Sequence, residues 1–300
     1  MKVYITGAGG FLGKELIRQL GVQNEKEIYA LTSQIDRMEA FAESYVNVRV
    51  VGKNAIIDGK TDLNPDDVLI NCAFPRTLDD FEMSGGLDYI QKTLSAAVRA
   101  GAHKIINISS QSVYDASRTE PAKETDYLVL QSKYAVGKYT TELMLRMLEE
   151  RCACTNIRLA SLIGPGFDQR LTNKMADFAI ERHKLSAEQS DQRFGFLDVE
   201  DAARGIIRLL DQPADQWESV YNLGSDSAYS LEEIAQTIAE LMQAEWNTCV
   251  EITYTQGDKK FSSALDNTRL KNCIGQYQQV DLKESMRRII ALKMKRRNDA

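Results

Sequence analysis

The chain has 300 residues, of which 43% are hydrophobic and 27% charged, and its formal net charge is −6. This composition predicts a soluble globular protein of one or two domains, without nucleic-acid or membrane partners, because the sequence has no basic stripe and no apolar run of roughly 18 residues. Five cysteines without a signal-peptide pattern ahead of them predict reduced thiols and a cytoplasmic location, and only two histidines argue against a metal site or a Ser-His-Asp hydrolase.

The first predicted elements are a strand, KVYIT (2–6), a glycine turn and a helix that starts in FLGKELIRQL. Glycines in such a turn allow a ligand to approach the backbone, and the N-terminus of the helix favours an anion such as a dinucleotide pyrophosphate. The spacing is T-G-x-x-G-x-x-G and not G-x-G-x-x-G, and a turn without a ligand is the alternative. The residues expected at the cofactor here are Gly7, Gly10, Phe11, Leu12 and Gly13.

Short apolar strands then alternate with helical patterns. Strands are expected at 27–32, 46–52, 67–74, 104–110 and 155–164, and helices near 85–100 and 130–150. This alternation predicts an α/β fold with a Rossmann-type, doubly wound parallel sheet whose ligand lies at the carboxyl ends of the strands. Ala73 and Phe74 end one of these strands and are expected beside the cofactor.

The alternation becomes less regular beyond LIGPGF (162–167). Helices are expected near 172–182, 199–211, 230–243 and 281–293, and short strands near 219–223 and 249–254. We therefore predict a dinucleotide-binding domain over 1–165 and a smaller, mixed α/β substrate lobe over 166–300, with segments near 195–225 returning to the first domain.

Candidate catalytic residues lie where strand 104–110 ends and in the following helix. Tyr134 and Lys138 are four residues apart on one helical face, with Glu142 another turn on. A phenol with a pKa of about 10 is a poor base, but an adjacent ammonium favours the phenolate, so Tyr134 could exchange a proton with a substrate oxygen that Ser110 holds. A helix with a surface tyrosine and lysine is the alternative.

Near the end of strand 27–32, the stretch ALTSQIDR offers no carboxylate directly after the strand for the ribose of NAD. Ser33 is neutral, and Arg37 could reach a 2′-phosphate, so we expect NADP, with NAD as the alternative. The other interpretation is that residues 32–34 only cap the helix that follows.

Taken together, TGAGGFLG, SSQSVY and Y-x-x-x-K resemble the extended short-chain dehydrogenase/reductases, specifically the NAD-dependent epimerase/dehydratase group that modifies nucleotide-linked sugars. IRLASLIGPG, FLDVEDAARGI, VYNLGS and LDNTRLKN are similar to later segments of that group, so the resemblance covers the whole length. It implies that Ser110, and not Ser109, is the catalytic serine. It also implies a homodimer formed through the helices near 85–100 and 130–150, the second of which carries Tyr139, Leu143, Met144, Met147 and Leu148.

The resemblance also implies substrate contacts. Ser161 takes the place of an asparagine that touches the sugar nucleotide in many epimerases, Asn173 resembles a diphosphate-contacting asparagine, and Arg193 lies one residue from a phosphate-binding arginine. Gln111 and Ser112 replace the Asp-Glu pair of the 4,6-dehydratases, which argues against dehydration.

The predicted function is hydride transfer to or from a carbon, often carbon 4, of a nucleotide-linked sugar, by a keto-sugar reductase or an epimerase. The NADP expectation favours the reductase. The alternatives are a reductase of a small carbonyl substrate without a nucleotide, and a non-catalytic, cofactor-sensing relative. The presence of both Tyr134 and Lys138 argues against the second.

Overall fold

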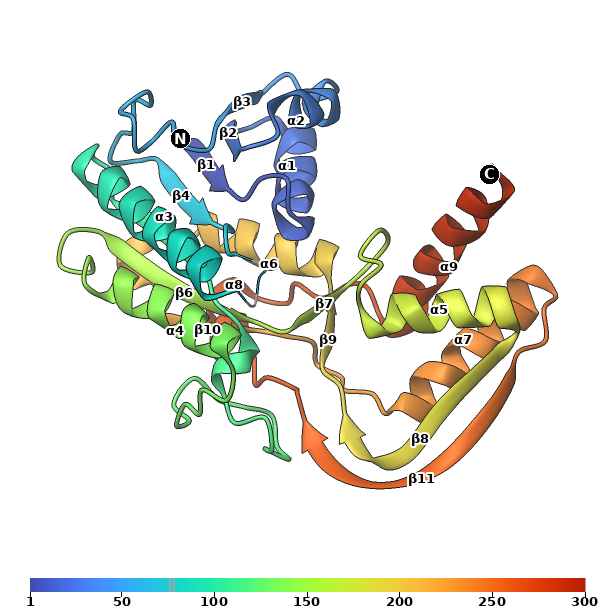
Figure 1. The fold of residues 1–300 in the computed structure, drawn as a ribbon. Helices are drawn as coiled ribbons and strands as arrows, with labels where there is room; N and C mark the ends of the chain where they lie inside the picture. The colour runs from blue at the N-terminus through green and yellow to red at the C-terminus, as the bar shows by residue number, and fades with distance from the viewer. Residues whose placement is uncertain (76, 78, 300) are drawn as a thin grey trace.

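The computed structural model describes residues 1–75, 77 and 79–299. Within them, seven parallel strands form one sheet in the order β10-β6-β5-β4-β1-β2-β3 (Figure 1). This order confirms the predicted Rossmann-type architecture. The strands are β1 (Lys2–Thr6), β2 (Glu27–Thr32), β3 (Val48–Gly52), β4 (Val68–Asn71), β5 (Lys104–Ile108), β6 (Ala153–Leu159) and β10 (Val220–Leu223).

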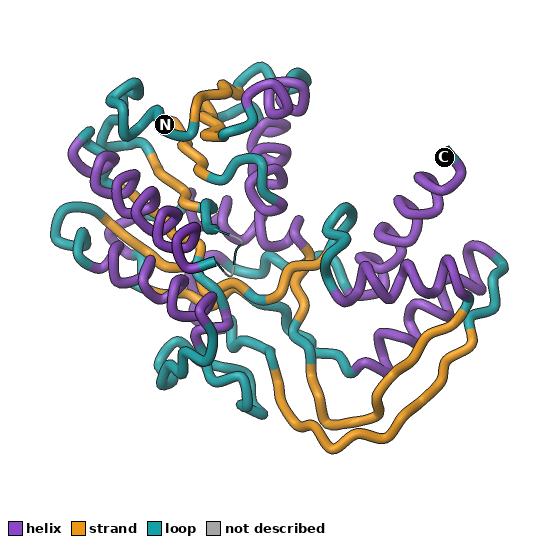
Figure 2. Tube along the Cα trace, in the orientation of Figure 1, coloured by secondary structure: helices purple, strands orange, loops and turns teal. Residues whose placement is uncertain are grey.

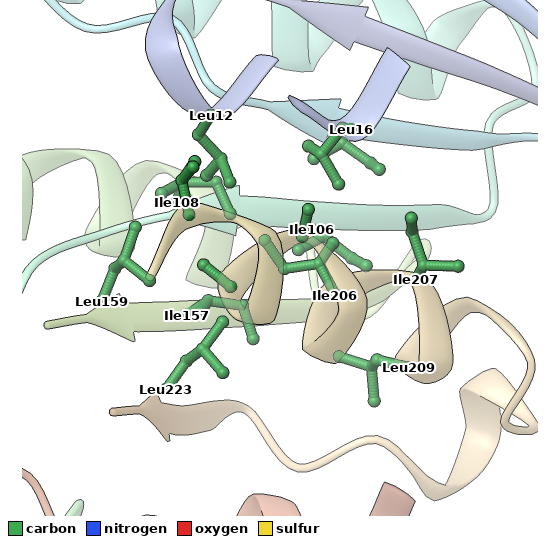
Figure 3. Close-up of a cluster of buried hydrophobic side chains, with 14 of the residues drawn as sticks. Leu12, Leu16, Ile106, Ile108, Ile157, Leu159, Ile206, Ile207, Leu209 and Leu223 are labelled. Atoms are coloured by element: carbon green, nitrogen blue, oxygen red, sulfur yellow. The ribbon is translucent and has the colours of Figure 1, made fainter. Parts of the chain in front are cut away.

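Helices cover both faces of this sheet. The helices of the sheet region are α1 (Phe11–Gln23), α2 (Ile35–Ala42), α3 (Asp80–Arg99), α4 (Lys133–Arg146), α6 (Val199–Leu210) and α8 (Thr268–Ile274). On one face, Leu12 and Leu16 of α1 and Ile206 of α6 pack against the strands (Figure 3). On the other face, Ile90 of α3 and Leu145 of α4 belong to a second cluster. Such burial on both faces explains why the strands read as continuous apolar runs.

Four polar side chains interrupt this apolar sheet in one row across its strands. Thr6 of β1 donates to Asn71 of β4 (2.7 Å), and Asn71 donates to Asn107 of β5 (2.9 Å). Asn107 in turn donates to Asn156 of β6 (2.8 Å). The four residues are register partners, so each buried amide meets the next and the row carries no desolvation cost from unpaired groups.

The second lobe contains a long parallel strand pair that the sequence does not reveal. Its elements are β7 (Ser161–Ile163), α5 (Leu171–Arg182), β8 (Lys184–Arg193), β9 (Phe196–Asp198), α7 (Leu231–Trp246), β11 (Glu251–Ser262) and α9 (Leu282–Asn298). Figures 1 and 2 show β8 and β11 curving together beneath α7. Two expectations were wrong here: residues 155–164 form two strands interrupted at Ala160, and the strand expected at 249–254 extends to Ser262.

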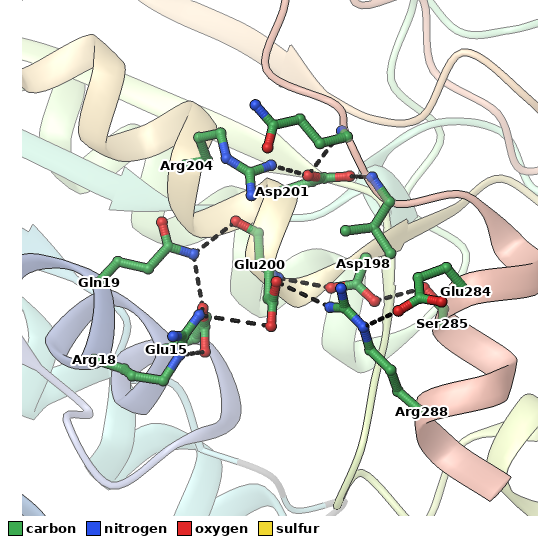
Figure 4. Close-up of polar contacts among 12 residues, drawn as sticks. Glu15, Arg18, Gln19, Asp198, Glu200, Asp201, Arg204, Glu284, Ser285 and Arg288 are labelled. Carbon is green, nitrogen blue, oxygen red and sulfur yellow. Dashed lines mark hydrogen bonds and ion pairs between the residues drawn. The ribbon is translucent and has the colours of Figure 1, made fainter. Parts of the chain in front are cut away.

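Polar contacts join α6 to α1 and α9, as Figure 4 shows. Asp198 is the N-cap of α6 and accepts from Ser285 of α9 (2.5 Å). Glu200 pairs with Arg18 of α1 (3.6 Å) and with Arg288 of α9 (2.9 Å). The start of α6 therefore connects the helices of the sheet with the second lobe. The predicted boundary at residue 165 remains a prediction.

Candidate active site

A cavity of about 560 Å³ opens at the carboxyl ends of β1, β4, β5 and β6. The strand order places it where the crossover direction changes, the usual ligand position in such sheets. The predicted site residues that line it are Gly7, Gly10, Phe11, Leu12, Gly13, Phe74, Ser110, Tyr134, Lys138 and Ser161. The fold thus brings together the glycine turn and the candidate catalytic residues, which are roughly 100 or more positions apart in the sequence.

The glycine turn is held tightly against the end of β4. Gly7 has a φ of +62°, and a Cβ there would lie 2.8 Å from the backbone N of Ala73. A Cβ on Gly13 would lie 2.5 Å from Gly7 O, so both positions require glycine for packing. Gly10 is the N-cap of α1 without a side-chain cap, and it faces the cavity. Ala73 itself does not line the cavity but supports the turn, with its N–H bound to Thr6 Oγ1 (3.3 Å).

The catalytic candidates meet at the other end of the cavity. Lys138 is 5% exposed and donates through Nζ to Ile108 O at the end of β5 (2.7 Å). The same Nζ lies 4.3 Å from the ring centroid of Phe74 and 5.9 Å from that of Tyr134. These contacts place an ammonium beside the phenol ring, and Tyr134 remains 37% exposed toward the cavity.

Ser110 continues from β5 and begins a short 3₁₀ helix, Gln111–Val113. Its Oγ accepts from Ser112 N (3.2 Å) and lies 3.1 Å from Ser112 Oγ. These contacts hold the Ser110 hydroxyl at the cavity wall.

A buried ion pair lies directly behind these residues. Glu142, one turn beyond Lys138, forms a two-point contact with Arg158 of β6, at 3.1 and 2.8 Å. Ser109 donates to the same carboxylate (2.5 Å), and Arg158 also donates to Tyr114 Oη (3.0 Å). The i, i+4, i+8 spacing from Tyr134 indicated the position of Glu142. Its partner Arg158 could be found only in the fold.

Several predicted residues lie outside the cavity lining. Ser33 and Arg37 are exposed after β2, and no ion pair of Arg37 occurs among the residues described. Asn173 is fully buried and donates to Gly164 O (3.2 Å). Arg193 forms an exposed ion pair with Glu233 (2.8 Å) on α7. Their proposed roles in binding remain predictions.

The cavity also contains residues for which the sequence predicted no role in the site. Ser109, Gln111 and Ser112 were considered only for the catalytic serine and for dehydration, and the others are Cys72, Pro75, Thr77, Ile108, Leu159, Ala160, Leu162, Phe167, Gln169 and Arg170. Burial raises the pKa of the Cys72 thiol to about 12, so this cysteine is neutral at physiological pH and is a poor nucleophile. Arg170 lies over the Phe167 ring (4.8 Å) at the start of α5. No sequence signal distinguishes it from other surface arginines.

The family model for the NAD dependent epimerase/dehydratase family matches residues 3–224. The chain belongs to this family. This match confirms the family and the NAD-dependent enzymatic nature predicted from the sequence.

Similar proteins include both kinds of enzyme considered above. A UDP-glucose 4-epimerase of Mycolicibacterium smegmatis is 25% identical over 311 residues, covering 97% of each chain. A dTDP-4-dehydro-6-deoxy-D-allose reductase of a Streptomyces species is 25% identical over 272 residues, covering 81% of this chain and 82% of that protein. The solved UDP-N-acetylglucosamine 4-epimerase of Methanobrevibacter ruminantium has a TM-score of 0.83 at 17% identity, with 98% of each chain covered.

The geometry fits a dinucleotide. The glycine turn leaves backbone without side chains at the N-terminus of α1, which suits a pyrophosphate. In the described residues no group of three His, Cys, Asp or Glu side chains could hold a metal ion, and no helix is long and apolar enough to cross a membrane.

Proposed function

We propose that this enzyme transfers hydride between a nicotinamide dinucleotide and a ring carbon of a nucleotide-linked sugar. The observation that carries the proposal is the convergence of Ser110, Tyr134 and Lys138 on the cavity that begins at the glycine turn. The bound nicotinamide supplies or accepts the hydride. Every other step belongs to side chains of this chain.

In this proposal, Tyr134 moves the proton and Ser110 orients the oxygen that gains or loses it. The Lys138 ammonium, anchored on Ile108 O, favours the ionised form of the phenol through its positive charge. The Glu142–Arg158 pair fixes the end of β5 through Ser109, so Ser110 and Lys138 keep their relative positions during turnover.

We propose NADP as the preferred cofactor. Ser33 and Arg37 are exposed at the carboxyl end of β2, where a 2′-phosphate of the adenosine ribose would lie. Thr32 turns back to accept from Gln34 N (3.0 Å), which supports its role in shaping this turn. NADP favours a reductase, which consumes its cofactor once per cycle, over an epimerase, which regenerates it.

For the substrate diphosphate we propose Arg170 together with the N-terminus of α5. Arg170 lines the cavity, whereas the predicted contacts Asn173 and Arg193 are bound to Gly164 O and to Glu233. Because the side chains of Asn173 and Arg193 already have partners within the protein, this observation also favours the alternative substrate, a small carbonyl compound without a nucleotide.

We further propose a homodimer formed through α3 and α4, in the cytoplasm. Leu143 of α4 and Met147, the C-cap residue of that helix, are 41% and 84% exposed, and Phe81 at the start of α3 is 89% exposed. Met144 and Leu148 pack toward the core and cannot contribute as much. The free thiols of all five cysteines suit a reducing compartment. Light scattering at micromolar concentration tests the dimer, and a monomeric mass would contradict it.

The decisive experiment is a panel of UDP-, dTDP-, GDP- and CDP-sugars, including 4-keto forms, with NADH and NADPH. Binding at 100 times the dissociation constant should raise the free energy of unfolding by about 2.7 kcal/mol, visible as a thermal shift. Gly10→Val is the control, because its side chain would occupy the place of the pyrophosphate. Turnover of a small ketone, with no nucleotide sugar bound, would favour the alternative.

A further inference from the structure

One residue of the cavity wall, Gln111, has its side-chain orientation fixed by a residue that lies outside the cavity lining. Gln111 follows Ser110 directly, and both line the cavity. Its Oε1 accepts a 2.7 Å hydrogen bond from Nη2 of Arg118, which lies outside the lining. A guanidinium has only donors, so it can bind only the oxygen end of the amide. The Gln111 amide is therefore fixed with its oxygen toward Arg118.

The other end of this amide is a donor. Within the described part of the chain, Nε2 of Gln111 has no hydrogen-bond acceptor, while its oxygen is already engaged. The N–H groups of Gln111 are thus available at the wall beside Ser110. A substrate that leaves these donors without an acceptor would lose binding free energy on burial.

Arg118 adds a positive charge, and among the described residues no carboxylate lies within ion-pair distance of it, although the charges of Asp115 and Asp126 are near enough to stabilise the guanidinium. Its Nη1 donates to the backbone O of Asp115 (2.8 Å), and its Nε is buried without a partner. The carboxylate of Asp115 accepts instead from Ser117, through N–H (2.8 Å) and Oγ (2.7 Å). The guanidinium also lies 5.7 Å from the Tyr114 ring centroid. An arginine stays charged when buried, so its field acts on the cavity through Gln111.

We infer that Gln111, positioned by Arg118, selects a nucleotide sugar that carries a carboxylate beside the carbon at which hydride is transferred. This inference rests on the proposed function. A carboxylate accepts from the Gln111 donors by charge-assisted hydrogen bonds, and the charge of Arg118 favours it over a neutral hydroxymethyl group. Gln111 is then a specificity-determining residue, and Arg118 is a positioning residue.

The test compares matched sugar pairs on the NADP-loaded full-length protein. The probes are UDP-glucuronate with UDP-glucose, dTDP-glucuronate with dTDP-glucose, and GDP-mannuronate with GDP-mannose. Within each pair the nucleotide is identical, so the ratio of the two dissociation constants isolates the carboxylate. Calorimetry on the wild type, Gln111→Glu, Arg118→Gln and Arg118→Lys gives that ratio, and NADP titration of each variant reports the cofactor site separately.

The wild type should prefer the carboxylate member of a bound pair by roughly ten- to a hundredfold. Gln111→Glu should reverse the preference, because its carboxylate pairs with Arg118 and repels the substrate. Arg118→Gln should bring the ratio close to one, whereas Arg118→Lys should retain most of the preference, since lysine also has only donors. Arg49→Gln, an exposed arginine on β3, is the control for net charge and should leave the ratio unchanged.

If the wild type binds the sugars of a pair but does not prefer the one with the carboxylate, this inference is wrong and the proposed function is unaffected. Equal ratios for Arg118→Gln and the wild type would overturn the positioning role. If the loaded wild type binds none of these sugars and none in the wider panel, the proposed function fails and this inference fails with it. A folding defect alone would change both members of a pair equally and could not produce a reversal.

Discussion

The catalytic end of the cavity and the exposed end of β2 differ in how their side chains are held. At the catalytic end, Lys138 is 5% and Glu142 4% exposed, and each is bound to the end of β5, at Ile108 and Ser109. At the end of β2, Ser33 and Arg37 are exposed on a loop and on the first turns of α2. Substitutions at the first end therefore affect catalysis and stability together, whereas those at the second should change cofactor choice alone.

The first test of this difference is a substitution at the catalytic end that removes the phenol hydroxyl of Tyr134. Tyr134→Phe removes the hydroxyl but keeps the ring that contacts Phe74, with centroids 5.2 Å apart. General acid–base catalysis typically contributes about 10² to 10⁴ in rate, so kcat should fall by this factor while the dissociation constant of the cofactor stays nearly unchanged. Steady-state kinetics on the substrate from the panel measures it. Retention of most of the activity would remove Tyr134 from the proposed mechanism.

The second test concerns the ion pair behind the catalytic end. Glu142→Leu leaves the buried guanidinium of Arg158 without its carboxylate, which typically costs about 3 to 5 kcal/mol of unfolding free energy. Denaturant titration measures the loss, and Glu142→Leu with Arg158→Met should recover part of it because no charge then remains unpaired. A loss below about 1 kcal/mol in the single variant would show that the pair does not hold this end together.

The third test is at the ribose end. Ser33→Asp places a carboxylate where we propose the 2′-phosphate, so it should repel NADP and favour NAD through a new ribose hydrogen bond. A charge-assisted hydrogen bond is worth about 1.5 to 3 kcal/mol, so the preference should change by roughly ten- to a hundredfold. Parallel titrations with NAD and NADP measure it, and the unfolding free energy should not change. Tightly held NAD in the wild type, with no NADP preference, would favour an epimerase.

The smallest effect is expected at an exposed ion pair between α3 and α4. Lys133 and Asp80 lie 2.6 Å apart, but their side chains are 61% and 75% exposed. Asp80→Asn should change the unfolding free energy by about 0 to 1 kcal/mol, because water screens exposed charges. It is the matched comparison for Glu142→Leu in the same denaturant titration. A loss as large as that of the buried pair would show that exposure does not govern these effects.

The sequence alone indicated the Rossmann-type sheet, because strands buried on both faces are apolar throughout and each is followed by a helical pattern. It also indicated the glycine turn and the Tyr134–Lys138 spacing, since both are local: one depends on backbone conformation and the other on the helical repeat. These features led to the family that residues 3–224 confirm.

Only the tertiary structure shows the strand pairing and the side-chain contacts that depend on packing between separate parts of the chain. The polar strand β8 pairs with β11, a partner 67 residues further along the chain, so its own composition gives no strand signal. Glu142 of α4 meets Arg158 of β6 only because the helix packs against that strand, and Gln111 meets Arg118 because the loop after the short 3₁₀ helix folds back on it. Periodicity reports which face of an element is buried, but the choice of partner for a buried charge or an amide depends on the three-dimensional packing around it.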